Sequence, residues 1–341
     1  MSYPTVAKIS LKKLKNNALK VKKLLNRKTK FYAVVKSNAY GHGIVEVSNA
    51  LYQIVDGYCV SLLTEGIKLR VAGIDKDILM LTPPFLETAN DLVRYDITSA
   101  VSSLKEIKLL ENSAKILNRV AKIQLAINTG MNRLGFSSEK AIIFALTYIK
   151  KSKNLKLTGA FSHFGNVENK DYTKRQFERF LTLSKLIKKD YPKIDYHVSS
   201  SGGVLLDKKY HLDACRVGLL LYGYKPFKTD KITVEPIMKV YAKTIRVRSN
   251  LKGKNLMYGD NPSPFDTATI LRLGYADGVL RKGVNLSVNN LCMDISAVKG
   301  RRYRTLTPIM TNAYKLSKKW KTIPYEVLVN VTARSEMRYL D

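Results

Sequence analysis

Short apolar runs alternate with amphipathic helical segments from Phe31 to Tyr222, and this rhythm constrains the fold more than any other feature of the chain. The helical segments include Val45–Ile54, Glu65–Val71, Glu139–Lys150 and Tyr172–Lys188. The eight runs of strand length are Phe31–Lys36, Gly57–Leu62, Ile78–Leu81, Ile97–Val101, Lys122–Asn128, Leu157–Phe164, Asp195–Ser199 and Ala214–Tyr222. Strands that alternate with helices form parallel sheets, and eight such units close into a barrel without an open edge. The sequence therefore predicts an α/β fold with an N-terminal (β/α)8 TIM barrel.

A leading strand and a helix precede the barrel. The strand covers Thr5–Ser10, and Ser10 is placed to cap the helix that follows. The apolar residues of that helix recur three or four positions apart, at Leu11, Leu14, Ala18, Val21 and Leu25. Thr64 and either Ser137 or Ser138 are the expected caps of two later helices, and Gly73 is an expected helix stop.

The pattern changes after Gly223, where short β-rich runs replace the alternation. These runs are Met238–Val247, Ala268–Leu273, Ser287–Asn289 and Tyr325–Val331, with one candidate helix around Asn312–Trp320. Proline and polar residues between Pro226 and Lys231 interrupt the apolar sequence and mark a boundary. We expect two domains: the barrel over residues 9–228, and a mostly-β C-terminal domain over residues 229–341 that includes the leading strand, residues 1–8.

The chain has 341 residues, a formal net charge of +32 and three cysteines. Its lysines are spread over nearly every predicted helix without a basic block, so we interpret the charge as a lysine-rich surface rather than as a nucleic-acid or membrane site. No apolar run is long enough to span a bilayer, and no cysteine or histidine spacing is typical of a zinc site. These features predict a cytoplasmic protein with no metal and no specific nucleic-acid or membrane partner.

Polar residues collect where the predicted barrel strands end. Lys36 ends the first strand, Asn128–Gly135 follows the fifth, His163 lies at the end of the sixth, and Arg216 lies within the eighth. Active sites of such barrels form at the carboxyl ends of the strands, so these residues predict a site there. A lysine desolvated at this rim has a lowered pKa and can form a Schiff base with an aldehyde.

The segment Val35–Gly43, VKSNAYGHG, resembles the pyridoxal-phosphate (PLP) attachment motif of alanine racemases, which are fold-type III PLP enzymes. Thr129–Gly135, TGMNRLG, is similar to the segment of that family whose arginine lies on the substrate side of the site. The other matching motifs follow in the family's order, and they are Ser162-His163-Phe164, Arg216-Val217-Gly218, Gly274–Gly278, Cys292-Met293-Asp294 and Pro324–Val327.

The resemblance implies a role for each matching residue. Lys36 would hold PLP covalently and act as one catalytic base, and Tyr275 of the partner subunit in a homodimer would be the opposite base. His163 and Arg216 would join Tyr275 to the cofactor through hydrogen bonds. Arg216 can only donate to the pyridine nitrogen, which then stays unprotonated, and this favours racemisation over transamination. The remaining implied contacts are Tyr40, Ser201 and the amides of Gly218 and Leu219 for the phosphate, and Arg133 and Met293 for the substrate carboxylate.

The chain departs from the family pattern at several positions. Ala126 stands where family members often carry a carbamylated lysine that steadies the substrate-site arginine, so Asn128 or Asn132 would have to steady Arg133. Ala333 stands where a tyrosine normally assists the phosphate, with Tyr325 and Tyr339 the nearest substitutes. The spacer between Gly278 and Cys292 is also shorter than usual.

Four functional hypotheses follow. The first is an amino-acid racemase that interconverts L-alanine and D-alanine with Lys36 and Tyr275 as its two bases. A broader-specificity racemase is an alternative, because the shorter spacer opens the entrance. A PLP-binding paralogue with little turnover is a second alternative, against which Tyr275 and Met293 argue. A polyanion-binding protein is a third, and it rests on charge alone.

Overall fold

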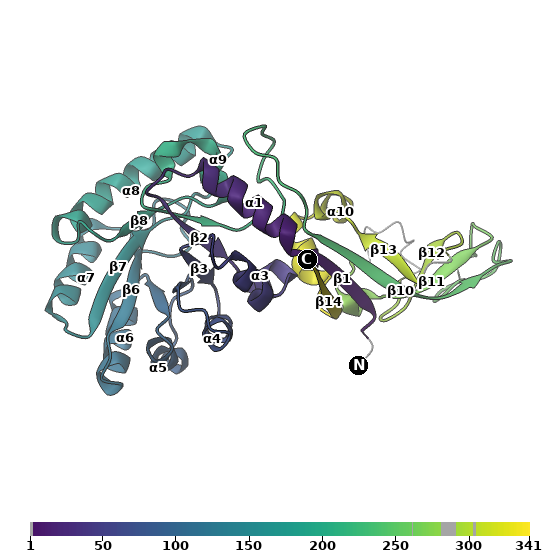
Figure 1. The fold of residues 1–341 in the computed structure, drawn as a ribbon, viewed down its shortest axis with the longest axis horizontal. Helices are drawn as coiled ribbons and strands as arrows, with labels where there is room; N and C mark the ends of the chain where they lie inside the picture. Colours follow the sequence, from purple (N-terminus) through teal and green to yellow (C-terminus); the bar gives the residue numbers. More distant parts are fainter. Residues whose placement is uncertain (1–2, 261, 281–290, 303–304) are drawn as a thin grey trace. The chain divides into compact units, whose positions relative to one another are not determined.

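The computed structural model describes residues 3–260, 262–280, 291–302 and 305–341 (Figure 1). The chain forms two compact units. One unit contains Lys15–Ser37 and Ile44–Val234, and the other contains Met1–Leu14, Asn38–Gly43 and Glu235–Asp341. Within the described ranges, no helix has both the length and the apolar character needed to cross a membrane.

The first unit contains an eight-stranded sheet in which all paired strands run parallel, in the order β8-β7-β6-β5-β4-β3-β2-β9 (Figure 1). The strands are β2 (Lys30–Val34), β3 (Gly57–Val60), β4 (Asp77–Met80), β5 (Thr98–Val101), β6 (Ala121–Ala126), β7 (Leu155–Phe161), β8 (Asp195–His197) and β9 (Ala214–Val217). Two backbone bonds join the end strands, from Asp213 N to Tyr196 O at 3.0 Å and from Arg216 N to Ser199 O at 2.9 Å. The predicted (β/α)8 barrel is therefore confirmed.

Helices connect successive strands of the barrel (Figure 1). They are α3 (Ile44–Leu51), α4 (Leu63–Val71), α5 (Leu86–Arg94), α6 (Leu104–Ile116), α7 (Glu139–Lys151), α8 (Lys170–Asp190), α9 (Ser201–Leu206) and the short η1 (Lys208–Tyr210), after a leading α1 (Leu11–Leu24). The predicted apolar face of α1 is buried at Leu14, Ala18 and Val21. Its predicted cap is also confirmed, because the Ser10 hydroxyl accepts a hydrogen bond from Lys13 N at 3.2 Å.

The second unit contains a six-stranded sheet in the order β12-β11-β10-β1-β14, with β13 paired to β10. Its strands are β1 (Thr5–Ser10), β10 (Met238–Arg248), β11 (Ala268–Arg272), β12 (Ser296–Lys299), β13 (Leu306–Met310) and β14 (Ser335–Leu340). The leading strand β1 pairs antiparallel with β10 and parallel with β14, so it belongs to this sheet and not to the barrel. The unit also contains two helices, α10 (Ala313–Trp320) and α11 (Pro324–Asn330), and the single turn η2 (Tyr275–Asp277).

Two local predictions are wrong, and a third lies outside the described residues. The run Tyr325–Val331 was predicted as a strand and is wrong, because Pro324 begins helix α11 and Val327 and Leu328 are buried on one side of it. Thr64 is not a cap, since α4 begins one residue earlier with Leu62 at the N-cap. The predicted run Ser287–Asn289 lies outside the described residues.

Other local predictions are confirmed. Ser138 caps α7 through a hydrogen bond from Ala141 N at 3.3 Å. Gly73 follows the end of α4 with a positive φ of 85°, a conformation that favours glycine. The candidate helix around Asn312–Trp320 is α10, in which the Asn312 side chain accepts from Tyr314 N and Lys315 N.

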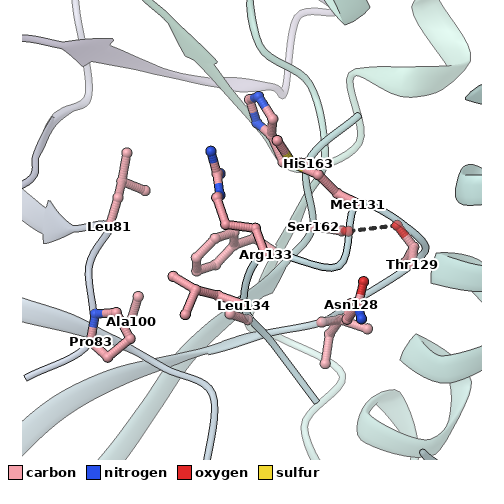
Figure 2. A pocket seen from close by; sticks show the side chains of 13 residues that line it. Leu81, Pro83, Ala100, Asn128, Thr129, Met131, Arg133, Leu134, Ser162 and His163 are labelled. Atoms are coloured by element: carbon pink, nitrogen blue, oxygen red, sulfur yellow. Dashed lines mark hydrogen bonds between the residues drawn. The ribbon is translucent and has the colours of Figure 1, made fainter. Parts of the chain in front are cut away.

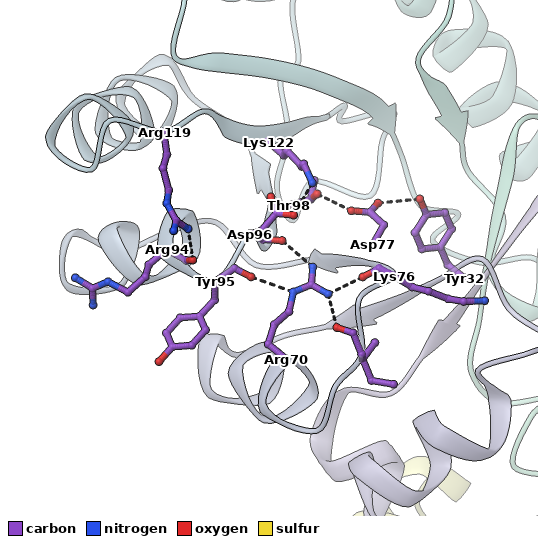
Figure 3. Close-up of polar contacts among 11 residues, drawn as sticks. Tyr32, Arg70, Lys76, Asp77, Arg94, Tyr95, Asp96, Thr98, Arg119 and Lys122 are labelled. Atoms are coloured by element: carbon purple, nitrogen blue, oxygen red, sulfur yellow. Dashed lines mark hydrogen bonds and ion pairs between the residues drawn. The ribbon is translucent and has the colours of Figure 1, made fainter.

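At the end of the barrel where the strands begin, Arg70 holds two loops together (Figure 3). Its guanidinium donates to four backbone carbonyls: Ile74 O and Lys76 O at 2.7 Å each, Asp96 O at 2.8 Å and Tyr95 O at 3.0 Å. These carbonyls lie at the end of α5 and in the loop before β4, where no strand or helix supplies partners. The single Arg70 side chain therefore supplies the donors that neighbouring backbone amides would supply in a strand or helix.

We predict that Arg70→Met lowers the free energy of unfolding by about 3 kcal/mol, because it leaves four carbonyls without their charged donor. Arg94→Met is the matched control, since Arg94 makes an exposed ion pair with Asp91 and donates to no distant loop. Its effect should stay within about 0.5 kcal/mol. Urea unfolding of both variants measures the difference, and equal small effects would contradict the role of Arg70.

Candidate functional site

Lys36 lies at the carboxyl end of the barrel strand β2, in an unusual backbone turn. The sequence predicted that Lys36 is the last residue of this strand. The strand instead ends at Val34, and Lys36 is the first residue of the short α2 (Lys36–Gly41). The residues that follow Lys36 are left-handed, with φ of 54°, 53°, 53° and 51° at Ser37, Asn38, Ala39 and Tyr40. Each such residue costs about 1–2 kcal/mol, so the turn needs support from its surroundings.

The second half of this turn packs against α11 within the same compact unit. A Cβ atom on Gly41 would lie 2.3 Å from Thr332 Oγ1 and 2.5 Å from Leu328 O, so only glycine fits there. The buried ring of Tyr40 packs edge-on against the ring of Tyr325, with 5.4 Å between centroids. These contacts hold the turn that carries Lys36 in its strained conformation.

Two physical effects lower the pKa of the Lys36 amine. Burial is the larger cause, and the positive charge of Arg133 is the second. The carboxylate of Glu65 acts in the opposite direction, but that group is itself held by the backbone amides of Ser61 and Leu62 at 3.0 and 3.1 Å. A lowered pKa increases the fraction of neutral amine, which is the form that attacks an aldehyde.

Arg216, on β9, places a buried guanidinium at the same end of the barrel, with only 3% of the residue exposed. It donates to Ser162 O at 2.7 Å, to His197 O at 3.4 Å and to Val198 O at 3.5 Å. Burial lowers its pKa to about 10, so the group stays positively charged at neutral pH. Among the described residues, no carboxylate lies within ion-pair distance of it.

Arg216 also fixes the protonation of two histidines. It donates to Nδ1 of His197 and, at 3.4 Å, to Nδ1 of His163. Because arginine cannot accept a hydrogen bond, both histidines must carry their proton on Nε2. In His197 that proton points to Gln124 Oε1 at 2.8 Å. Burial and the charge of Arg216 lower the pKa of His163 to about 3, so its Nε2–H is a neutral donor.

Arg133 lies in the loop after β6, beside a small pocket at the carboxyl end of the barrel (Figure 2). The apolar wall of this pocket is formed by Leu81, Ala100, Ala126 and Phe161. Asn128 was expected to steady Arg133, but its side chain instead bonds to the loop itself. It accepts from Gly130 N at 3.0 Å and Asn132 N at 3.1 Å, and it donates to Ser137 Oγ at 3.1 Å. Asn128 therefore fixes the backbone that carries Arg133.

A patch of hydrogen-bonding groups lies where α9 begins. The Ser201 hydroxyl accepts from Gly218 N at 3.3 Å and from Leu220 N at 3.4 Å. The segment Gly218–Leu220 follows β9 directly, so the patch and Arg216 belong to the same barrel end. Hydroxyl and backbone N–H groups of this kind are typical ligands of a phosphate.

The donor set of this barrel end fits PLP. Lys36 would supply a nucleophilic amine, Arg216 a buried donor for a pyridine nitrogen, and the Ser201 patch phosphate ligands. Arg133 and His163 line the same pocket, and Arg216 donates to His163 at 3.4 Å. The charge of Arg133 also lowers the pKa of Lys36. No cluster of metal-ligating side chains occurs in the part of the chain that the structure describes.

Tyr275 and Met293 lie together in the second unit. Tyr275 N donates to Cys292 O at 3.1 Å, and Ala276 N donates to Met293 O at 3.0 Å. The sequence did not identify Arg334, which ties the two segments together through Asp277 at 3.3 Å and Asp294 at 2.9 Å. Tyr275 and Met293 remain exposed, at 42% and 54%, so both side chains are free to contact another molecule.

These features define the class of barrel enzymes that bind PLP. They are the (β/α)8 barrel, the desolvated Lys36, the buried Arg216 without a carboxylate partner among the described residues, and the Ser201 patch. The chain also matches the family model "Alanine racemase, N-terminal domain" over residues 9–226. It is 30% identical to an alanine racemase of Methanococcus maripaludis, over 100% of both chains.

Solved structures of racemases have the same fold as this chain. The chain is similar to alanine racemase of Clostridium difficile 630, with a TM-score of 0.91 and 29% identity over 100% of this chain and 96% of that one. It is also similar to a histidine racemase of Leuconostoc mesenteroides, with a TM-score of 0.87 and 20% identity over 99% and 98% of the two chains, which shows a shared fold. The chain belongs to the alanine racemase family, and it is a PLP-dependent isomerase.

The buried histidines predict a loss of stability in acid. All four histidines, His42, His163, His197 and His211, have pKa values lowered mainly by burial. The unfolded chain takes up protons near pH 6.5 that the folded chain does not, so stability falls as the pH drops below that value. His42 and His163, whose pKa values fall to about 4 and about 3, should each lower the free energy of unfolding by about 2 kcal/mol between pH 7 and pH 5.

Urea unfolding of the wild type and of His163→Gln at both pH values measures this contribution. The variant should lose about 2 kcal/mol less than the wild type over that interval, because glutamine takes up no proton. Identical pH dependence in the two proteins would show that His163 is not held neutral.

Proposed function

We propose that the protein interconverts L-alanine and D-alanine by a two-base mechanism with Lys36 and Tyr275. The observation that carries the proposal is the placement of two basic groups on neighbouring barrel strands. Lys36 follows β2, and the buried Arg216, which has no carboxylate partner among the described residues, lies on β9, which pairs with β2. PLP, when bound, withdraws electrons from the substrate α-carbon. In this site a permanent cation would face the pyridine nitrogen, which favours return of the proton to the α-carbon.

The chain's own residues would bind the substrate and move its proton. Arg133, which lies beside the pocket of Figure 2, would pair with the substrate carboxylate, together with Met293 N. Lys36 Nζ would exchange the α-proton on one face of the substrate, and the Tyr275 oxygen would do so on the other. The Nε2–H of neutral His163 supports this role of Tyr275, because a donor is what a phenolate base requires.

We further propose that the enzyme is a cytoplasmic homodimer in which Tyr275 and Met293 serve the partner's barrel. Exposed apolar residues at the carboxyl end of the barrel support a covering subunit, because Leu62, Phe85 and Leu86 lie at the starts of α4 and α5. The free cysteines Cys59, Cys215 and Cys292 fit a reducing compartment. The PLP-binding domain would cover residues 9–228 and the β-rich domain residues 229–341 with 1–8.

A broader substrate range is the second candidate. The observation that favours it is the pair of small side chains, Ala100 and Ala126, in the apolar wall beside Arg133. A racemisation assay over a panel of amino acids separates the two candidates, since an alanine racemase prefers alanine strongly over larger apolar substrates.

The two-base dimer predicts that two inactive variants restore activity when mixed. Lys36→Ala removes one base and Tyr275→Phe removes the other, so neither homodimer should racemise alanine. In a hybrid dimer one of the two sites contains both native residues. After subunit exchange half of the dimers are hybrids, so about a quarter of wild-type activity should return.

Subunit exchange is followed in parallel by native mass spectrometry of the mixture. Exchange without recovered activity would contradict a site shared between subunits. Activity in the Tyr275→Phe homodimer would contradict the assignment of the second base.

The contact between Tyr40 and Tyr325 predicts which hydroxyl replaces the missing phosphate tyrosine at Ala333. Tyr325 packs on Tyr40, an expected phosphate ligand, whereas Tyr339 lies in β14 opposite Ile9. We expect Tyr325→Phe to weaken PLP binding about 10- to 100-fold, the effect of one hydrogen bond to a charged group. Tyr339→Phe is the control and should leave the Kd unchanged.

Fluorescence titration of the apoprotein with PLP gives the Kd values. If Ala333→Tyr tightens binding and Tyr325→Phe does not change it, then no other hydroxyl has replaced the phosphate tyrosine.

A further inference from the structure

Gln176 joins the loop of His163 to the loop of Arg133 through one buried side chain. It lies on α8 and is 1% exposed. Its Oε1 accepts a hydrogen bond from Gly165 N at 2.9 Å, and its Nε2 donates to His163 O at 3.1 Å. The same Nε2 donates to Thr129 Oγ1 at 3.3 Å. The first two bonds fix the loop after β7, and the third reaches the loop after β6.

A second link runs between the same two loops. The hydroxyls of Thr129 and Ser162 lie 2.8 Å apart, as the dashed line in Figure 2 shows. Ser162 is adjacent to His163 and its carbonyl accepts from Arg216. A shift of Thr129 would therefore be transmitted to the carbonyl that holds Arg216 and to the backbone that carries His163.

Two other side chains of α8 form hydrogen bonds to the Arg133 loop. The Tyr172 hydroxyl donates to Gly130 O at 3.0 Å, and Arg179 donates to Ser137 O at 2.8 Å. Among the described residues, neither side chain donates a hydrogen bond to the His163 loop, although the Tyr172 ring lies beside Gly165. Removal of the Tyr172 hydroxyl alone therefore provides a comparison for Gln176.

We propose that Gln176 is a positioning residue that fixes His163 relative to Arg133, and so sets the proton relay and the substrate carboxylate site together. This inference rests on the proposed roles of these two residues. The position requires one acceptor and two donors at the same point, and only an amide side chain supplies both. Glutamate has the shape but cannot donate, and methionine has the length but forms none of the three bonds.

The test compares Gln176→Met with Tyr172→Phe as PLP-saturated holoenzymes. Loss of a buried hydrogen bond corresponds to roughly a tenfold change in an equilibrium or rate constant. For Gln176→Met we expect KM for alanine to rise about tenfold and kcat to fall about tenfold. For Tyr172→Phe, which loosens only the Arg133 loop, we expect KM to rise while kcat stays within about twofold.

A readout independent of catalysis accompanies the kinetics. Hydrogen exchange of the Gly165 amide, followed by mass spectrometry, should be faster in Gln176→Met and unchanged in Tyr172→Phe. Unchanged exchange in Gln176→Met would overturn the proposal, because the hydrogen bond would not exist. Faster exchange with the kcat of the wild type would also overturn it, since the bond would then be structural only.

Three further variants keep the outcome decisive. If Gln176→Met does not fold, Thr129→Val removes the Gln176 and Ser162 bonds at similar volume, and a fall of kcat supports the proposal whereas unchanged kcat contradicts it. His163→Gln and Arg133→Gln test the roles on which the inference rests. Full activity in either would refute the proposed function itself, independently of the result at Gln176.

Discussion

The buried guanidinium of Arg216, which has no acidic partner in the part of the chain that the structure describes, is the constraint on which the rest of the site depends. The carbonyls of Ser162, His197 and Val198 accept from Arg216, so one side chain joins the ends of β7, β8 and β9. The same group sets the tautomers of two histidines and disfavours further positive charge around it. A neutral pyridine nitrogen can accept a hydrogen bond from this guanidinium and adds no further positive charge beside it. For this reason the donor set suits PLP.

The second constraint is the left-handed turn after Lys36. Four consecutive residues without glycine's freedom keep a positive φ, and the contacts of Gly41 with Thr332 and Leu328 and of Tyr40 with Tyr325 stabilise them. The second half of this turn is therefore supported by α11, a helix near the other end of the chain. The C-terminal region retains this support, even though its spacer between Gly278 and Cys292 is shorter than usual and Ala333 lacks a hydroxyl.

Local patterns predicted the barrel, the leading strand and the cap at Ser10, because alternation and capping depend on near neighbours in sequence. The sequence did not reveal Arg70, Gln176 or Arg334, whose partners are carbonyls and carboxylates brought close only by folding. The error at Tyr325–Val331 has a similar origin. Its valines favour a strand locally, whereas Pro324 and burial of one side produce a helix. Motif order predicted the candidate site residues, and long-range hydrogen bonds explain the orientation of the side chains.

We propose that Lys36 holds the cofactor in this barrel, and borohydride reduction tests this role most directly. Reducing the PLP-loaded protein with borohydride fixes the cofactor to its lysine, and peptide mass spectrometry then locates it among the many lysines of this chain. We expect a single modified peptide that contains Lys36, and no modification in the Lys36→Ala variant. A label on another lysine, or a protein that takes up no PLP, would contradict it.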